Sequence, residues 1–204
     1  MTREILLVPH ANREQNLQAT SRAAELLQDA GITVRVCADE KVLPGLKHVP
    51  HTEDAASGCE LVLVLGGDGT FLRAADMARS VDIPVLGINL GHVGFLAEWE
   101  VESLDQALVR VIDKRYRIED RLTIDVTIFD EEGTLLNRSW ALNEASVENQ
   151  NRSGVLDAIL EVDRRPVSSF GCDGVLISTP TGSTAYAFSA GGPVLWPSLD
   201  AILV

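Results

Sequence analysis

The sequence lacks the long apolar runs and the ligand spacings that would assign it to several large classes of protein. None of its apolar runs reaches the 18 residues of a membrane-spanning helix, and the one near the N-terminus, Ile5–Val8, is too short for a signal peptide. Its three cysteines, Cys37, Cys59 and Cys172, form no C-x-x-C pair, and its four histidines show no H-E-x-x-H spacing. These absences favour reduced thiols in a cytoplasmic protein without a structural zinc site.

Basic residues are also scarce in the sequence. It has 17 Lys and Arg against 30 Asp and Glu, which gives a formal net charge of −13. This balance argues against non-specific nucleic-acid binding, which depends on Lys and Arg at the phosphates. A protein of this charge that handles phosphates must offset its own negative field locally, with backbone N–H groups, a few Arg residues and a metal ion.

Strands and helices alternate in the first half of the chain, which is typical of a parallel α/β domain. The expected elements are a strand over Ile5–Val8, a helix with Leu17, Thr20, Ala24 and Leu27 on one face, a strand over Thr33–Cys37, an irregular connection over Ala38–Gly58, a strand over Leu61–Leu65, a helix over Phe71–Arg79, a strand over Pro84–Ile88, and a helix marked by Val101, Leu104, Leu108 and Val111. The unbroken apolar run Leu61–Leu65 indicates a strand that is buried on both faces. Ser103 and Gln106 are spaced as a capping box for the last helix.

The pattern changes near residue 118, where strands replace the alternation with helices. Strands are expected over Thr123–Phe129, Leu135–Leu142, Leu156–Val162 and Pro166–Phe170, with short turns between them. We therefore predict an α/β N-terminal domain with a parallel sheet over residues 1–118, and a β-rich, sandwich-like second domain over residues 119–204.

A glycine-rich turn is the clearest chemical signal in the first domain. Gly66-Gly67-Asp68-Gly69-Thr70 follows the buried strand and precedes a helix. Glycines let the backbone approach a ligand closely, and the unpaired N–H groups at a helix start suit a phosphate. At the carboxyl end of the strand, the Asp68 carboxylate can hold Mg²⁺ or accept a proton from an attacking hydroxyl. The turn is neither a Walker loop nor a Rossmann fingerprint, and it also fits a plain strand-to-helix connection with Asp68 as helix N-cap.

Two further segments place polar residues near strand ends. Asn89–Leu96 follows the next strand and carries two glycines three residues apart, so we expect its backbone beside Asp68. Asn143 and Glu144 interrupt an apolar run, and together they offer the donor and acceptors that bind the hydroxyls and ring edge of a nucleoside. The simpler interpretations are a glycine turn for the first segment and a strand edge facing water for the second.

The segment Gly171–Tyr186 is the longest informative stretch of the sequence. A strand over Val175–Ile177 leads into small polar residues and then into a helix near Ser183–Ser189. Ser, Thr and Gly at a helix start favour close backbone contact and hydroxyl hydrogen bonds, and Tyr186 offers a flat face for stacking on an adenine. A Ser/Thr-rich connection without a ligand is the simpler interpretation.

Together and in this order, these motifs resemble those of the bacterial NAD kinases. The resemblance covers Ile5 to Pro193 and rests on Gly66–Thr70, Asn89-x-Gly91-x-x-Gly94-Phe95-Leu96, Asn143-Glu144, and Asp173-Gly174 with Thr179–Tyr186. The first motif is shared with diacylglycerol and sphingosine kinases and with phosphofructokinases, whereas the last two are far more specific. The resemblance implies transfer of a phosphoryl group from ATP, or from inorganic polyphosphate, to the 2′-hydroxyl of the adenosine ribose of NAD, which makes NADP.

The resemblance also implies roles for individual residues. Asp68 matches the family's general base. Contacts to the nucleotide and substrate are implied for Gly67, Gly69, Arg73, Asn143, Glu144, Asp173, Thr181, Gly182, Thr184, Ala185, Tyr186, Ala187, Phe188 and Ser189. Gly171 stands where many relatives carry a basic residue, so this charge contact is either missing or supplied by Arg152 or by a neighbouring subunit.

The remaining expectations concern partners and the extent of the chain. The family uses a divalent metal ion, expected here as Mg²⁺ on the donor phosphates, with Asp68 as the one protein ligand considered. It forms homodimers or homotetramers with composite sites, and we expect a cytoplasmic protein that binds neither nucleic acid nor membrane. Relatives continue beyond Val204, so the second domain is expected to be truncated, with an open sheet edge. A lipid kinase that shares the glycine turn, and a nucleotide-sensing module without catalysis, are the alternatives.

Overall fold

Two compact units make up the chain, Met1–Ile118 and Glu119–Val204. The computed structural model describes residues 3–10, 14–37, 43, 45–89, 99–100, 103–149 and 154–204. The first unit contains a parallel sheet with helices, and the second is rich in antiparallel strands. The predicted fold class is therefore confirmed.

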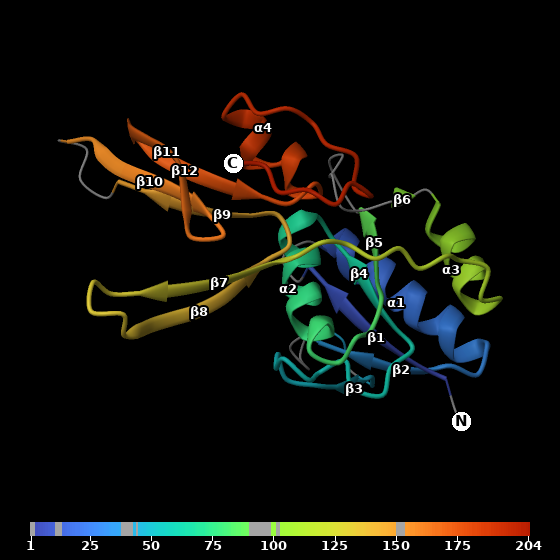
Figure 1. The fold of residues 1–204 in the computed structure, drawn as a ribbon. Coiled ribbons are helices and arrows are strands. Elements are labelled where there is room, and N and C mark those ends of the chain that lie inside the picture. Colours follow the sequence, from blue (N-terminus) through green and yellow to red (C-terminus); the bar gives the residue numbers. More distant parts are fainter. Residues whose placement is uncertain are drawn as a thin grey trace. The chain divides into compact units, whose positions relative to one another are not determined.

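A six-stranded parallel sheet forms the centre of the N-terminal unit (Figure 1). Its strands are β1 (Glu4–Pro9), β2 (Thr33–Val36), β3 (Lys47–His48), β4 (Leu61–Leu65), β5 (Val85–Asn89) and β6 (Trp99–Glu100), in the order β3-β2-β1-β4-β5-β6. The chain adds strands on one side of β1 and then on the other, so the strand order reverses between β1 and β4. In open α/β sheets, the crevice at the carboxyl ends of two such strands is the usual place for a ligand.

Helices cover both faces of this sheet, α1 and α3 on one side and α2 on the other (Figure 1). They span Glu14–Asp29 (α1), Asp68–Arg79 (α2) and Leu104–Ile112 (α3). Alternate side chains of β4 point to opposite faces of the sheet. Leu61, Leu63 and Leu65 pack with α1 and α3. Val62 and Val64 pack with α2. All five are buried, as the unbroken apolar run predicts for a strand with both faces covered.

Two helix starts differ from the sequence-based expectation. α2 begins at Asp68, three residues before the predicted Phe71, because residues of the first turn need no intrahelical partner for their N–H groups and glycine there costs little. α3 has Ser103 as its N-cap residue, but the Ser103 side chain makes no capping hydrogen bond. Its ψ of 6° departs from the extended backbone that a capping serine adopts, so the predicted capping box is wrong.

Arg3 ties the start of β1 to the end of α3. Its guanidinium donates to the Glu60 carboxylate, with Nε at 2.9 Å from Oε2, and to the backbone carbonyls of Val111 and Ile112 at 2.8 and 2.6 Å. The Arg3 guanidinium hydrogen-bonds Glu60 and thereby holds the pKa of this carboxyl below its ordinary value, with burial opposing the effect. The arginine thus serves both as an ion-pair partner and as a C-terminal cap for α3.

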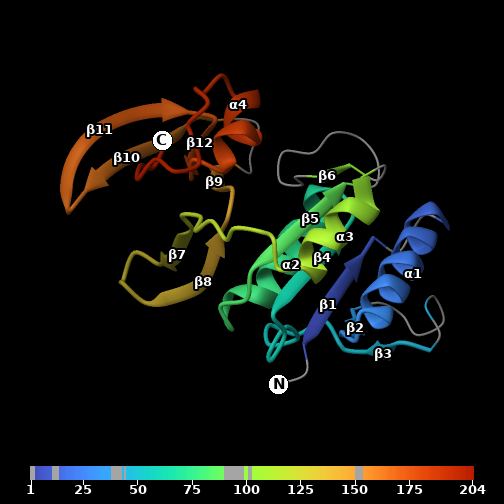
Figure 2. The same ribbon diagram turned by 90° about the vertical axis from the view of Figure 1, so that its right-hand side faces the viewer.

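The described part of the C-terminal unit contains three two-stranded antiparallel sheets in place of one continuous sheet. The pairs are β7 (Ile124–Phe129) with β8 (Leu135–Ala141), β9 (Glu144–Glu148) with β12 (Gly174–Ser178), and β10 (Leu156–Val162) with β11 (Arg165–Cys172). Figure 2 shows β10 and β11 as a long curved hairpin. A 3₁₀ turn over Gly182–Thr184 and a short helix, α4 (Tyr186–Ser189), follow β12. The sequence pattern did not predict β9, which begins at Glu144, the second residue of the polar pair that interrupts the apolar run.

The turn of the β10–β11 hairpin contains two residues in the left-handed region. Asp163 and Arg164 have φ angles of 51° and 63°. A two-residue hairpin with positive φ at both positions is the type that usually recruits Asn-Gly, because its backbone follows the twist of the strands. This turn keeps that geometry without a glycine, and left-handed backbone is costly for a residue with a Cβ.

Candidate active site

The glycine turn lies at the carboxyl end of β4, where the strand order of the sheet reverses. The backbone N–H of Gly66 donates to the Ile88 carbonyl at 3.0 Å, and the N–H of His10, just after β1, donates to the Leu65 carbonyl at 2.9 Å. A Cβ on Gly66 would stand 2.8 Å from the Thr70 hydroxyl and 3.0 Å from the His10 Cβ. Only glycine fits there without a shift, so the turn passes tightly between the end of β1 and the first turn of α2.

Asp68 is the first residue of α2 and not its cap. The N-cap is Gly67, which has extended backbone, and no side chain caps this helix start. The alternative interpretation of Asp68 as a helix N-cap is therefore wrong. The Asp68 carboxylate therefore lies in the first turn of the helix, next to N–H groups that have no intrahelical partner. Gly69 follows in the same turn, and a Cβ there would meet no atom of the described residues within 4 Å, which leaves room for a ligand to approach its backbone.

Arg73 brings positive charge to the same edge of the sheet. Its side chain is exposed on α2. Burial raises the pKa of the Cys37 thiol, just after β2, and the charge of Arg73 opposes that rise. The guanidinium therefore acts at the carboxyl ends of the strands, which is the edge that carries Asp68. The segment 90–96 that we expected beside Asp68 lies outside the described residues, as does Arg152; Asn89, the last residue of β5, is buried.

In the C-terminal unit, buried hydroxyl groups hold the turn after β12 in place. After β12, the Thr179 hydroxyl donates to the Leu142 carbonyl at 2.6 Å and accepts the Gly182 N–H at 3.0 Å. The Thr179 N–H donates to the Asn143 carbonyl at 2.9 Å. These bonds join the end of β12 to the bend before β9, so Thr181 and Gly182 lie against the Asn143-Glu144 pair.

Gly182 makes the closest of these approaches. A methyl group on Gly182 would overlap the Asn143 carbonyl and stand 2.6 Å from the Asn143 Cα. Both atoms belong to the backbone, so no rotation of a flexible side chain relieves the overlap. The glycine is therefore what allows the turn after β12 to pack against the start of β9.

Three buried oxygen atoms, on residues of this turn and of the adjoining start of β9, have no hydrogen-bond partner among the described residues. They are Asn143 Oδ1, Glu144 Oε2 and Thr181 Oγ1. Burial raises the pKa of Glu144, and a backbone hydrogen bond from Tyr186 opposes that rise. Buried polar atoms are usually paired, so this group of acceptors is well suited to receive the donors of a ligand.

The remaining residues of the predicted site are divided between two places. Thr184 and Ala185 follow Gly182, and α4 presents Tyr186 and Phe188 with about half of each side chain exposed, whereas Ala187 is buried. Asp173 stands before β12 and Thr181 after it, and β12 runs from Gly174 opposite Glu148 to Ser178 opposite Glu144. At about 3.3 Å per residue, the strand separates Asp173 from the Asn143-Glu144 pair by more than about 13 Å. Asp173 is therefore not brought together with the acceptor group.

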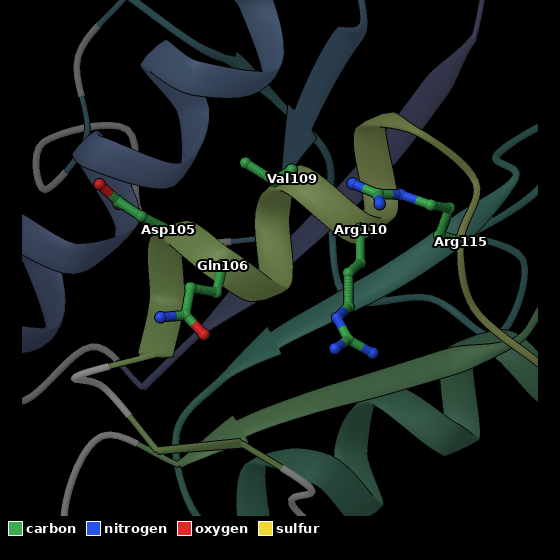
Figure 3. A pocket seen from close by; sticks show the side chains of 5 residues that line it. All are labelled: Asp105, Gln106, Val109, Arg110 and Arg115. Carbon is green, nitrogen blue, oxygen red and sulfur yellow. The ribbon is translucent and has the colours of Figure 1, made fainter.

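A surface hollow of about 560 Å³ lies on α3, apart from the predicted site residues of this unit (Figure 3). It is lined by Asp105, Gln106, Val109, Arg110 and Arg115. Arg115 pairs with Asp113 at 2.6 Å, and Asp105 pairs with Arg22 at 3.2 Å, so these charges are already engaged. Neither Asp68 nor Arg73 lines this hollow.

The described residues hold no ready-made metal centre and no membrane helix. Within them, no group of three or more His, Cys, Asp or Glu side chains is arranged to hold a metal ion. No helix in the described ranges is both long and apolar enough to cross a bilayer. A metal ion at the carboxyl end of β4, near Asp68, would thus need ligands from a bound phosphate in addition to any from the protein.

Comparison with known proteins identifies the family to which both halves of the chain are similar. Residues 5–116 match the ATP-NAD kinase N-terminal domain, and residues 142–204 match the ATP-NAD kinase C-terminal domain. NAD kinases of Corynebacterium efficiens and Corynebacterium diphtheriae are 67% and 63% identical over 99% of this chain, which spans 66% of the length of each, slightly under two thirds.

Solved structures show the same fold. A yeast NADH kinase complexed with NADH superposes with a TM-score of 0.86 at 23% identity, over 98% of this chain and 64% of that one. An NAD kinase from Archaeoglobus fulgidus in complex with ATP superposes with a TM-score of 0.67 at 26% identity, over 99% and 70%. With both halves matched in sequence and fold, the chain belongs to the ATP-NAD kinase family.

Proposed function

We propose that the protein transfers a phosphoryl group from ATP to the 2′-hydroxyl of the adenosine ribose of NAD. Family membership and the names of the corynebacterial relatives support this activity. The single observation that carries it is the acceptor group formed by Asn143, Glu144 and Thr181, whose buried oxygens lack partners among the described residues. Ribose hydroxyls and the adenine amino group are donors of the kind that these oxygens require.

Recognition of the nucleoside follows from the geometry around β9. The amide of Asn143 and the carboxylate of Glu144 are adjacent, so they are suited to hold neighbouring hydroxyls of one ribose. Tyr186 is 48% exposed, which leaves its ring free to stack on an adenine. Thr184 to Ser189 would line the same adenosine pocket. A ligand without ribose hydroxyls would leave these buried oxygens unpaired and would therefore bind weakly. This cost favours NAD over a lipid alcohol as the substrate.

Asp68 would act as the general base on the 2′-hydroxyl. It stands at the carboxyl end of β4, in the first turn of α2, where Gly67 and Gly69 leave the backbone N–H groups accessible to phosphate oxygens. Arg73 adds positive charge at the same edge. These residues would hold the donor phosphate, while the carboxylate takes the proton that leaves the attacking oxygen.

We also propose that a divalent ion, Mg²⁺, accompanies the donor phosphates. The described residues offer no complete metal site, so the ion would be held mainly by phosphate oxygens, with Asp68 as its protein ligand. Such an ion supplies charge neutralisation at the transferring phosphoryl group. A protein with a net charge of −13 has a particular need for it. The three cysteines are free thiols, which supports a cytoplasmic location.

A homodimer or homotetramer with composite sites is the proposed assembly. Asp173 lies at the opposite end of β12 from the acceptor group, so a compact nucleoside cannot touch both within one chain. A second subunit would supply Asp173, and Arg152, to the nucleoside held by the first. Mixing inactive Asn143→Ala and Asp173→Ala proteins should then restore part of the activity, because mixed oligomers contain intact composite sites. Failure of the mixture to recover any activity would count against this assembly.

The activity is tested by supplying NAD with ATP, or with polyphosphate, and Mg²⁺, and measuring NADP. Asp68→Asn should keep NAD affinity and lower turnover by roughly 10²-fold or more, the usual contribution of a general base. Asp76→Asn, on the same helix, is the matched control and should retain wild-type turnover. Turnover of Asp68→Asn within a few-fold of wild type would remove that residue from the role. Labelling of diacylglycerol in place of NAD would indicate a lipid kinase, and NAD binding without NADP formation would indicate a sensing module.

A further inference from the structure

Two buried polar atoms flank the glycine turn without a use in the mechanism above. They are Nδ1 of His10, just after β1, and Oγ1 of Thr70, in the first turn of α2. Neither atom has a hydrogen-bond partner among the described residues. Both lie where the strand order reverses, which is the usual ligand position of such a sheet.

Thr70 is an exception among the buried hydroxyl side chains of this protein. The described residues include five buried Ser and Thr side chains: Thr20, Thr70, Ser178, Thr179 and Ser183. Four of them bond a backbone carbonyl; Thr20, for example, donates to the Asn16 carbonyl one helical turn earlier at 2.6 Å. Thr70 is only 2% exposed and makes no such bond. A buried hydroxyl that bonds neither protein nor water destabilises the free protein, so a reason is needed for its presence.

His10 and Thr70 approach each other across Gly66. A Cβ on Gly66 would be 2.8 Å from the Thr70 hydroxyl and 3.0 Å from the His10 Cβ. The His10 N–H bond to the Leu65 carbonyl holds the histidine backbone against the end of β4. A single methyl group on Gly66 would therefore touch both residues, at the uncapped start of a twelve-residue helix.

A phosphate is the ligand whose chemistry fits this arrangement. A threonine hydroxyl and a protonated imidazole nitrogen are both hydrogen-bond donors, and the helix start contributes further N–H groups and the positive end of its dipole. Because the protein carries a net charge of −13 and Asp68 stands in the same helical turn, neutral donors are needed to offset repulsion of an anion. Within the turn Gly66–Thr70, Asp68 is the one carboxylate, and a cation would gain nothing from the N–H groups.

We propose that His10 and Thr70 bind a phosphate oxygen of the phosphoryl donor and so position it for attack. This assignment rests on the proposed kinase function, and it adds to the backbone N–H groups of the glycine turn a donor-side contact made by the side chains of His10 and Thr70. Neither residue exchanges a proton in the reaction; both act by holding the donor phosphate. Their loss should therefore affect donor binding far more than acceptor binding.

The test compares variants of each residue in steady-state assays with ATP and NAD varied separately. His10→Leu and Thr70→Val should each raise the KM for ATP about tenfold or more, the usual effect of losing a hydrogen bond to a charged group, and leave the KM for NAD within about twofold. His10→Asn keeps an N–H donor near the position of Nδ1 and should recover most of the loss. His51→Leu, at an exposed histidine, is the matched control and should behave as wild type.

Thr70→Val also separates binding from a structural role. The hydroxyl has no partner to lose among the residues that the structure describes, so the valine variant should melt at the wild-type temperature or higher. A lower melting temperature, an unchanged KM for ATP, or a rise confined to the KM for NAD would each overturn the proposal. A structural hydroxyl would give the first of these outcomes, and an acceptor-side contact the last.

A binding measurement without turnover distinguishes this proposal from the proposed function. Inorganic tripolyphosphate should raise the melting temperature of the wild-type protein, and this shift should be largely absent in His10→Leu and Thr70→Val. If the wild type forms no NADP but shows the tripolyphosphate shift only with both residues intact, the kinase activity fails and the phosphate contact stands. If the wild type forms NADP and all variants keep the full shift, only the phosphate contact fails.

Discussion

The contact between Gly182 and Asn143 gives a sharp prediction for Gly182→Ala. The added methyl group would overlap the Asn143 carbonyl and come within 2.6 Å of the Asn143 Cα. Non-bonded carbon atoms settle at about 3.5–4.0 Å, so the two segments must separate by about 1 Å. The Thr179 N–H bond to the Asn143 carbonyl opposes this separation, because it joins the same two segments at 2.9 Å.

The expected loss of stability follows from these two contacts. Overpacking of a rigid site usually costs about 1–3 kcal/mol, and backbone atoms on the opposing side place Gly182→Ala near the upper end. Stretching the bond between Thr179 and Asn143 adds about 1 kcal/mol. We therefore expect the free energy of unfolding to fall by about 3–4 kcal/mol. Displacement of Asn143 should also weaken NAD binding about tenfold, the equivalent of one lost hydrogen bond.

Urea unfolding followed by circular dichroism measures the first effect, and NAD titration calorimetry measures the second. Gly154→Ala is the matched control, because a Cβ there meets no atom of the described residues within 4 Å and its backbone is not left-handed. Gly154→Ala should unfold and bind NAD as the wild type does. If Gly182→Ala matched this control in both measurements, the turn after β12 would not be packed against β9 as described.

Three further predictions concern ionisation and backbone strain, and urea unfolding checks each of them. Arg3→Ala should lower the free energy of unfolding by about 2 kcal/mol at pH 7, since it removes an ion pair and a helix cap. Because Arg3 lowers the pKa of Glu60 from 4.5, this loss of stability should shrink as the pH falls below 4.5. A loss that stays constant with pH would contradict the role of the ion pair. Burial raises the pKa of Glu144 above 4.5, so the negative charge of this carboxylate opposes folding at neutral pH. Glu144→Gln should therefore be more stable than the wild type at pH 7 and as stable as the wild type at pH 4. Equal stability of the two proteins at both pH values would contradict the burial of Glu144. Arg164→Gly should gain about 0.5–1 kcal/mol by relieving a φ of 63°, and a loss would show that the arginine side chain contributes contacts.

The secondary structure could be predicted from the sequence where the spacing of apolar residues matches the burial of the element. Leu61–Leu65 is apolar throughout because both of its faces are covered, and the run alone predicts this. The start of α2 was placed too late because glycine disfavours helix interiors, whereas the first turn tolerates it. Local pattern also missed β9, because its partner β12 lies about thirty residues further along the chain.

The candidate site was predictable only in part, for a related reason. Asp68 stands out because it lies in a glycine-rich turn directly after an apolar strand, and the Asn143-Glu144 pair because it interrupts an apolar run. Thr70 is part of the glycine motif, but the sequence gives no sign that its hydroxyl and His10 Nδ1 are buried without partners among the described residues, because their surroundings depend on the pairing of β1 with β4. The roles given to Thr184–Ser189 came from family resemblance, and they remain predictions.

The position of β4 has a consequence for how this protein would fail under stress. β4 is an interior strand between β1 and β5, so its amide hydrogens should exchange only when the whole first unit opens. β9 pairs with β12 alone in the described part of the chain, and a two-stranded ribbon opens more readily. Warming should therefore abolish nucleoside affinity before it disturbs the carboxylate at the end of β4, and an inactivated sample should recover on cooling as long as that first unit has stayed closed.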